Sequence, residues 1–154
     1  MSMLAVRTAQ AALVVRIREV LQKETDPETA DRVLAEAIRG DARAAGEAFA
    51  GRAIGGPNLE HFATVLDRWR EGGALDIECV TLTKDSLSFA VTRCAYAQAY
   101  AALGLDPVLG SILSCSRDEP FATGYSPSLS MDRSKTIMEG APRCLFTFTW
   151  RREP

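Results

Sequence analysis

Residues 75–94, LDIECVTLTKDSLSFAVTRC, carry the pattern that decides the fold of this chain. Apolar side chains alternate with other residues on either side of positions 84–86: Leu75, Ile77 and Cys79, then Leu87, Phe89 and Val91. A period of two is typical of strands with one buried face. The pattern predicts an antiparallel β-hairpin with its turn at residues 84–86 and with Cys79 on the apolar face.

The 72 residues before this hairpin are predicted to form three helices. Apolar side chains recur at helical spacing from Val6 to Leu21, from Ala30 to Phe49 and from Leu59 to Trp69. Asp26 followed by Pro27 is typical of a helix start, and Asn58 is positioned to cap the third helix. The pair of glycines at positions 72 and 73 should end that helix.

Helices and two further strands are predicted after the hairpin. Residues 95–103, AYAQAYAAL, are mostly good helix formers, and Asp106-Pro107 starts another short helix that ends in a polar loop at residues 114–118. Alternation returns at Leu129 and again at Cys144. The predicted fold class is α+β, with N-terminal helices packed against an antiparallel sheet of about four strands and helices inserted between the second and third strands. We expect one domain over 1–154, with a helical half (1–72) and an α+β half (73–154).

The composition is typical of a soluble globular protein. The chain has 154 residues, of which 47% are hydrophobic and 25% charged, with a net charge of −2. No basic stripe with interleaved aromatics indicates a nucleic-acid surface, and no apolar run reaches the roughly 20 residues of a membrane span. Arginines interrupt the N-terminal segment, which is not typical of a signal peptide. We therefore expect a cytoplasmic protein with reduced cysteines. Separately, the apolar helix around Leu13 to Leu21 could support a homodimer.

Two arginines stand at predicted strand ends, in phase with apolar side chains. Arg93 continues the face of Val91, and Arg133 continues the face of Met131. A charge on the core side must be paired or must reach water. Either both side chains extend outward from the strand ends, or they belong to a pocket for a small-molecule carboxylate, which a guanidinium binds bidentately.

Three cysteines lie at predicted element boundaries, where sites are often built: Cys94, Cys115 and Cys144. Cys115 is the candidate nucleophile, because Arg117 would favour its thiolate and Asp118 could accept a proton. A buried structural thiol is the alternative. The three cysteines with Asp118 could also form a tetrahedral zinc set, but no CxxC or His-rich spacing supports it, and we predict no metal.

Carboxylates, rather than histidine, are expected to move protons. His61 is the only histidine, and its position off the apolar stripe of its helix predicts a solvated side chain. Activation of water by Asp118 or Glu139 is therefore the other route beside attack by Cys115. No glycine-rich phosphate loop follows a predicted strand, and no cofactor is expected.

Several spaced motifs resemble the bacterial L-2-amino-thiazoline-4-carboxylic acid hydrolase family. In order they are Thr92-Arg93-Cys94, the helix from Tyr96 to Gly104, Leu113-Ser114-Cys115, Arg117-Asp118, Arg133, TIMEG at 136–140, and Cys144 with Phe146. The resemblance implies an enzyme that opens a cyclic, sulfur-containing amidine to a carbamoyl-cysteine, a step towards cysteine.

The resemblance and the pattern together give one set of site residues. Those expected to be catalytic are Cys115, Asp118 and Glu139, and those expected to bind substrate are Arg93, Cys94, Arg117, Arg133 and Cys144. The hairpin, helix and late Glu-Gly turn before Cys-x-Phe also resemble the small-molecule-binding domains related to vinyl reductases, which bind ligands without obvious catalysis. A non-catalytic ligand-binding or sensor domain is therefore the alternative function.

Overall fold

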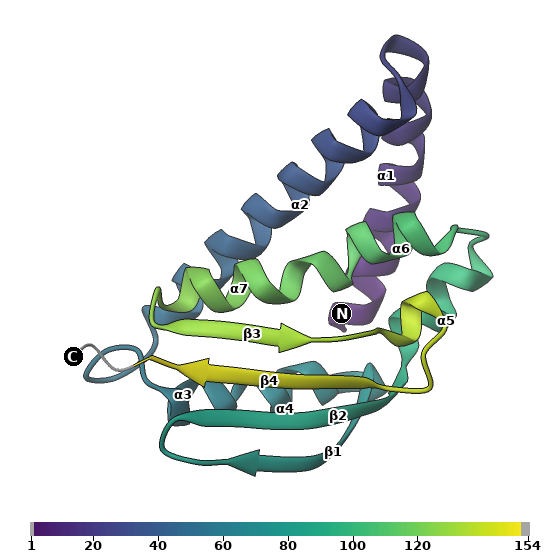
Figure 1. Ribbon diagram of the computed structural model, residues 1–154. Coiled ribbons are helices and arrows are strands. Elements are labelled where there is room, and N and C mark those ends of the chain that lie inside the picture. Colours follow the sequence, from purple (N-terminus) through teal and green to yellow (C-terminus); the bar gives the residue numbers. More distant parts are fainter. Residues whose placement is uncertain (1, 152–154) are drawn as a thin grey trace.

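The computed structural model describes residues 2–151 and has an α+β architecture, as the sequence predicts (Figure 1). Its elements are α1 (Met3–Glu24), α2 (Pro27–Ala50), α3 (Leu59–Ala63), α4 (Val65–Arg70), the 3₁₀ turn η1 (Glu71–Gly73), β1 (Leu75–Leu82), β2 (Ser86–Cys94), α5 (Ala95–Ala102), α6 (Pro107–Leu113), η2 (Cys115–Arg117), α7 (Asp118–Tyr125), β3 (Leu129–Arg133), η3 (Ile137–Glu139) and β4 (Cys144–Trp150). The four strands form one antiparallel sheet in the order β1-β2-β4-β3. Among the described residues, no helix is both long and apolar enough to cross a membrane.

The N-terminal helices begin where the capping residues predict. The Asp26 carboxylate accepts a hydrogen bond from the Thr29 amide at 2.9 Å, and Asn58 Oδ1 accepts one from the His61 amide at 2.8 Å. These side chains satisfy amides that the first helical turn leaves unpaired. The predicted third helix is divided at Thr64 into α3 and α4.

The side chain of His61 is partly buried, so the prediction of a solvated histidine was wrong. Its ring stacks on Phe49 with centroids 4.6 Å apart, and Nδ1 lies 2.9 Å from the Tyr125 hydroxyl. That hydroxyl donates to the Asn58 carbonyl at 2.9 Å and accepts from the Asn58 amide at 3.1 Å. The network joins the start of α3 to the end of α7.

The hairpin is confirmed, but two irregularities change which side chains face the core. A register shift between Asp76 and Ile77 pairs Asp76 with Arg93 and Leu75 with Cys94, and a second shift lies between Glu78 and Thr81. Cys79 lies in the second shift with a φ of 54° and is exposed, so its predicted place on the apolar face was wrong. Such bulges reverse the alternation of side chains beyond them.

The segment predicted as a polar loop at residues 114–118 is instead η2 followed by the start of α7. This helix packs against α2 with nearly touching backbones. A Cβ on Gly46 would lie 2.1 Å from the Phe121 carbonyl oxygen, and one on Gly124 would lie 2.3 Å from the Arg43 carbonyl oxygen. The two glycines therefore allow a helix pair whose partners are distant in sequence, which local patterns do not reveal.

The core lies on one face of the sheet, between the strands and the helices. Alternate residues of β4 are buried, while Thr147 and Thr149 on the opposite face are exposed. Phe62 of α3 meets Phe148 edge-on with centroids 5.0 Å apart, a geometry worth about 0.5–1.5 kcal/mol beyond burial alone. Figure 1 shows α7 alongside β3 and the α1–α2 hairpin reaching away from the sheet.

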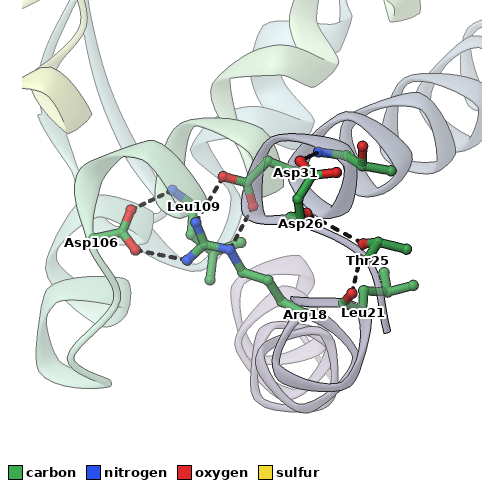
Figure 2. A network of polar contacts seen from close by, with 8 residues as sticks. Arg18, Leu21, Thr25, Asp26, Asp31, Asp106 and Leu109 are labelled. Carbon is green, nitrogen blue, oxygen red and sulfur yellow. Dashed lines mark hydrogen bonds and ion pairs between the residues drawn. The ribbon is translucent and has the colours of Figure 1, made fainter. Parts of the chain in front are cut away.

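An ion-pair network holds α1, α2 and α6 together (Figure 2). Arg18 donates to both carboxylate oxygens of Asp31, at 2.6 and 2.8 Å, and to Asp106 at 2.9 Å. Asp106 also caps α6 by accepting from the Leu109 amide at 2.9 Å. The planar guanidinium suits this bidentate geometry, and the network fixes the α1–α2 hairpin relative to the segment that leads to Cys115.

Candidate active site

A cavity of about 420 Å³ lies between the helices and the sheet. This volume falls within the roughly 300–1,000 Å³ typical of ligand pockets. Six of the eight predicted site residues line it: Cys94, Cys115, Arg117, Asp118, Arg133 and Cys144. Helices α1, α2, α4, α5 and α7 contribute to its wall, as do strands β2 and β4.

Asp118 and Arg133 form an ion pair in the cavity wall. Asp118 is the first residue of α7 and Arg133 the last of β3, and Nη1 of the arginine donates to Asp118 Oδ2. Nη2 donates to the Cys115 carbonyl at 3.1 Å, and the guanidinium lies 5.2 Å from the ring centroid of Phe146. The side chains are only 25% and 13% exposed, so the pair is held within the protein rather than at its surface.

The Asp118 carboxyl titrates close to neutral pH. Removal from bulk water raises its pKa from 3.8 to about 6, and the positive charges of Arg133 and Arg117 limit the rise. Desolvation disfavours the charged form, whereas a nearby cation favours it. At pH 7 the group is therefore mostly ionised and still able to accept a proton.

The three cavity thiols are protonated at neutral pH. Burial raises the pKa of Cys115 to about 12, and the negative charge of Asp118 adds to the rise. Burial likewise raises the pKa of Cys94 and of Cys144, whose sulfur accepts a hydrogen bond from the Ile137 amide at 3.2 Å. The prediction that Arg117 favours a Cys115 thiolate was wrong. The arginine that lowers this pKa is Arg133, and desolvation outweighs its charge.

Arg93 does not line the cavity, contrary to the prediction from strand phase. The register shift before it places its side chain beside Asp76, to which it donates two hydrogen bonds at 2.7 and 2.8 Å. A third bond reaches the Gly73 carbonyl at 2.8 Å. The same shift brings Cys94, paired with Leu75, onto the cavity side.

Glu139 also lies outside the cavity lining. Its carboxylate accepts hydrogen bonds from the Thr136 amide at 3.1 Å and the Thr136 hydroxyl at 2.8 Å. The Thr136 hydroxyl in turn accepts from the Glu139 amide, which completes a capping box at η3. Glu139 therefore has a local structural role, and Asp118 is the carboxylate that the structure brings to the cysteines.

The cavity contains residues that the sequence did not indicate. Arg7 of α1 and the tyrosines Tyr96 and Tyr100 of α5 are among them, together with Trp69 of α4. Arg7 lies on a helix with no reactive neighbours in sequence, so only its place in the fold shows that it lines the site. Within residues 2–151 no group of three His, Cys, Asp or Glu side chains is arranged to hold a metal ion.

A comparison with protein-family models matches residues 6–148 to L-2-amino-thiazoline-4-carboxylic acid hydrolase. The chain belongs to the L-2-amino-thiazoline-4-carboxylic acid hydrolase family. The match spans most of α1, all of α2 and the C-terminal half, and it includes every cavity-lining residue except Met3. A search of curated proteins finds no match.

Solved structures show a similar fold. The phenol-responsive sensory domain of the transcription activator PoxR, crystallised with phenol, aligns with a TM-score of 0.51 and 12% sequence identity. The alignment covers 94% of this chain and 74% of that chain. At this identity the likeness concerns the fold alone.

Proposed function

We propose that this protein is a hydrolase that opens a small cyclic substrate carrying a carboxylate, as the name of its family indicates. The observation that carries the proposal is the Asp118–Arg133 ion pair in the wall of a cavity. Asp118, with a pKa of about 6, suits a general base at neutral pH, because it is both ionised and able to take up a proton.

Water is the proposed nucleophile. Asp118 accepts a proton as the water oxygen attacks the ring carbon that is bonded to nitrogen and sulfur. The carbon–sulfur bond then breaks, one proton of the water ends on the ring nitrogen and the other on sulfur, and the attacked carbon becomes a carbonyl. For 2-amino-thiazoline-4-carboxylate the product is N-carbamoyl-cysteine, and no oxidant or reductant is consumed.

The charge of the cavity supports a carboxylate-bearing substrate. Five arginines line it among the described residues, against two carboxylates, Glu71 and Asp118. A cleft lined by an excess of one charge concentrates ligands of the opposite charge. Because the wall also contains Trp69 and Phe146, a flat ring with an acidic group matches both features.

The test is to incubate the purified protein with 2-amino-thiazoline-4-carboxylate and to measure the carbamoyl product by mass spectrometry. Asp118→Asn should lower kcat/KM by about 100-fold or more, the usual effect of losing a general base. Glu119→Gln is the matched control, because Glu119 is the next residue and pairs at the surface with Arg39. Lack of product with the unaltered protein, or equal activity of the two variants, would contradict the proposal.

Two further measurements examine the mechanism. The ionisation of Asp118 should make kcat/KM rise with pH and reach half its maximum near pH 6. Cys115→Ala should keep its activity, because the thiol is protonated and water is the attacking group. Loss of activity in this variant would instead assign the attack to the Cys115 sulfur.

Ligand binding without catalysis is the second candidate function. The observation that favours it is the aromatic part of the cavity wall, to which Phe49, Trp69, Phe121 and Phe146 contribute. The similar fold of the phenol-responsive sensory domain is consistent with a ligand of this kind. A rise in Tm with phenol or with the thiazoline acid, and no product from either, would favour this function, since a ligand of the folded state stabilises it by mass action.

We further propose a single-domain cytoplasmic protein that acts on a route towards cysteine. The four free cysteines suit a reducing compartment.

Leu13, Ile17 and Val20 are exposed along one side of α1 and could pair two copies of the chain. Analytical ultracentrifugation of the unaltered protein and of Ile17→Glu checks the pairing, and a monomer in both would contradict it.

A further inference from the structure

A second cluster of charges lines the cavity beside the Asp118–Arg133 pair. Arg7 of α1 and Arg117 of η2 both belong to the lining, and each places a guanidinium nitrogen near the same atom, Oδ2 of Asp41 on α2. The distance from Arg7 is 3.6 Å, and Arg117 donates a hydrogen bond to that oxygen. The consecutive helices α1 and α2 thus meet the distant η2 at one carboxylate.

The positive charge of this cluster exceeds its negative charge. The two arginine side chains are 21% and 12% exposed, whereas that of Asp41 is 63% exposed, so the cations lie inward of their shared anion. Arg7 also donates a hydrogen bond to a neutral group, the Gln10 side-chain carbonyl, at 2.8 Å. Enclosure and the charge of Arg117 lower the pKa of Arg7, as expected for two neighbouring cations with one anion.

We propose that Arg7 and Arg117 together bind the carboxylate of the ligand and so present its ring to Asp118. A ligand carboxylate would supply the second negative charge that the two guanidiniums lack, and the planar fork of each can donate two parallel hydrogen bonds. The identity of the ring rests on the proposed function. The expectation of a carboxylate rests on the geometry of the arginine cluster.

The other arginines are less suited to this role. Arg133 is already engaged by Asp118 and by the Cys115 carbonyl. Arg52 and Arg68 line the cavity but are exposed, where water weakens an ion pair. Tyr96 and Tyr100 line the same region, and burial raises the pKa of both, so their hydroxyls stay neutral and can donate hydrogen bonds to an anion.

The experiment compares two probes that differ only in the acidic group, 2-amino-thiazoline-4-carboxylate and 2-amino-thiazoline, by isothermal titration calorimetry. The unaltered protein should bind the acid more tightly than the neutral probe. Arg7→Gln should weaken binding of the acid by about 30-fold or more, which is the usual effect of removing one partner of an enclosed charge pair. The same variant should change binding of the neutral probe by less than about threefold.

Two variants control for charge and for folding. Arg16→Gln removes the same charge from the same helix at an exposed position, where the arginine pairs with Glu19, and should leave both affinities unchanged. Arg117→Lys keeps the charge but loses the fork, and should weaken binding of the acid if Arg7→Gln does not fold. Two results would overturn the inference. One is that Arg7→Gln and Arg117→Lys still bind the acid more tightly than the neutral probe, by the same factor as the unaltered protein. The other is that Arg16→Gln loses this preference as much as Arg7→Gln does.

Turnover of the acid, measured in parallel, separates this inference from the proposed function. If the preference for the acid depends on Arg7 but no product forms, the carboxylate site is supported and the hydrolase is contradicted. Turnover with an unchanged KM in Arg7→Gln would support the hydrolase and contradict the carboxylate site. Binding of neither probe by the unaltered protein would contradict both.

Discussion

The unaltered protein should lose stability as the pH rises, because Asp118 gives up its proton. Asp118→Asn should not lose stability from this source. The pKa of this carboxyl in the folded protein is about 6, against an ordinary value of 3.8. Between these values the folded protein binds more protons than the unfolded chain, so the free energy of unfolding falls with increasing pH. The stabilising effect of the proton is complete below about pH 3.8 and is lost as the pH passes through about 6.

The size of the effect follows from the two pKa values. They differ by about two units, and each unit corresponds to about 1.36 kcal/mol, which gives a loss of about 3 kcal/mol from this one group. The attraction of Arg133 is already contained in this figure, because it lowers the pKa that burial raises. The side chain is 25% exposed, so screening by water reduces the effect only in part.

The assay is urea-induced unfolding at a series of pH values for the unaltered protein and for Asp118→Asn, followed by the fluorescence of the partly buried Trp69. Asparagine does not titrate, and the difference between the two free energies isolates Asp118 from the other groups. Glu119→Gln serves as the control for a loss of charge at the same helix terminus. A difference that stays constant from about pH 4 to about pH 7, or that changes in favour of the unaltered protein, would refute the reasoning.

Four further variants examine packing near the site and the exposure of one thiol. Gly46→Ala should destabilise the protein by about 1–3 kcal/mol, because its Cβ would lie 2.1 Å from a backbone oxygen of α7. Gly40→Ala on the same helix meets nothing within 4 Å and should be neutral or stabilising by up to about 1 kcal/mol. Urea unfolding measures both effects. Tyr125→Phe removes the hydroxyl that bonds both backbone groups of Asn58, and the same assay should show a loss of about 1–3 kcal/mol. Cys79→Ser should abolish the fast phase of labelling by a thiol reagent, since the other three cysteines are at least partly buried; a fast phase that persists would show that a second thiol is accessible.

Much of the fold follows from local patterns in the sequence. The helix starts at Asp26 and Asn58 depend on side chains that bond amides three residues ahead, and the hairpin depends on alternation over a few residues. Such interactions act over one turn or one strand pair, so the sequence shows them directly. The cysteines at the ends of elements were found in the same way, because a boundary is itself a local feature.

Two departures from the predictions arise from long-range packing. Helix α7 was missed because its partner is Gly46 on α2, and the fit between the two backbones has no local signal. Arg93 was placed on the core side because strict alternation was assumed, whereas the register shift that places it opposite Asp76 results from pairing with another strand. In both cases the deciding contact lies outside the window that a sequence pattern covers.

The sequence by itself determined the α+β fold, the helix caps, the hairpin and the family, since each depends on neighbouring residues or on motifs in a fixed order. Only the tertiary structure decided which of the reactive residues line one cavity. It joined Arg117 to Asp41, 76 positions apart, brought Arg7 to the same carboxylate, and enclosed Asp118 so that its pKa lies near neutral. Charge and burial depend on which side chains surround a group in space, and that arrangement is set by packing across the whole chain.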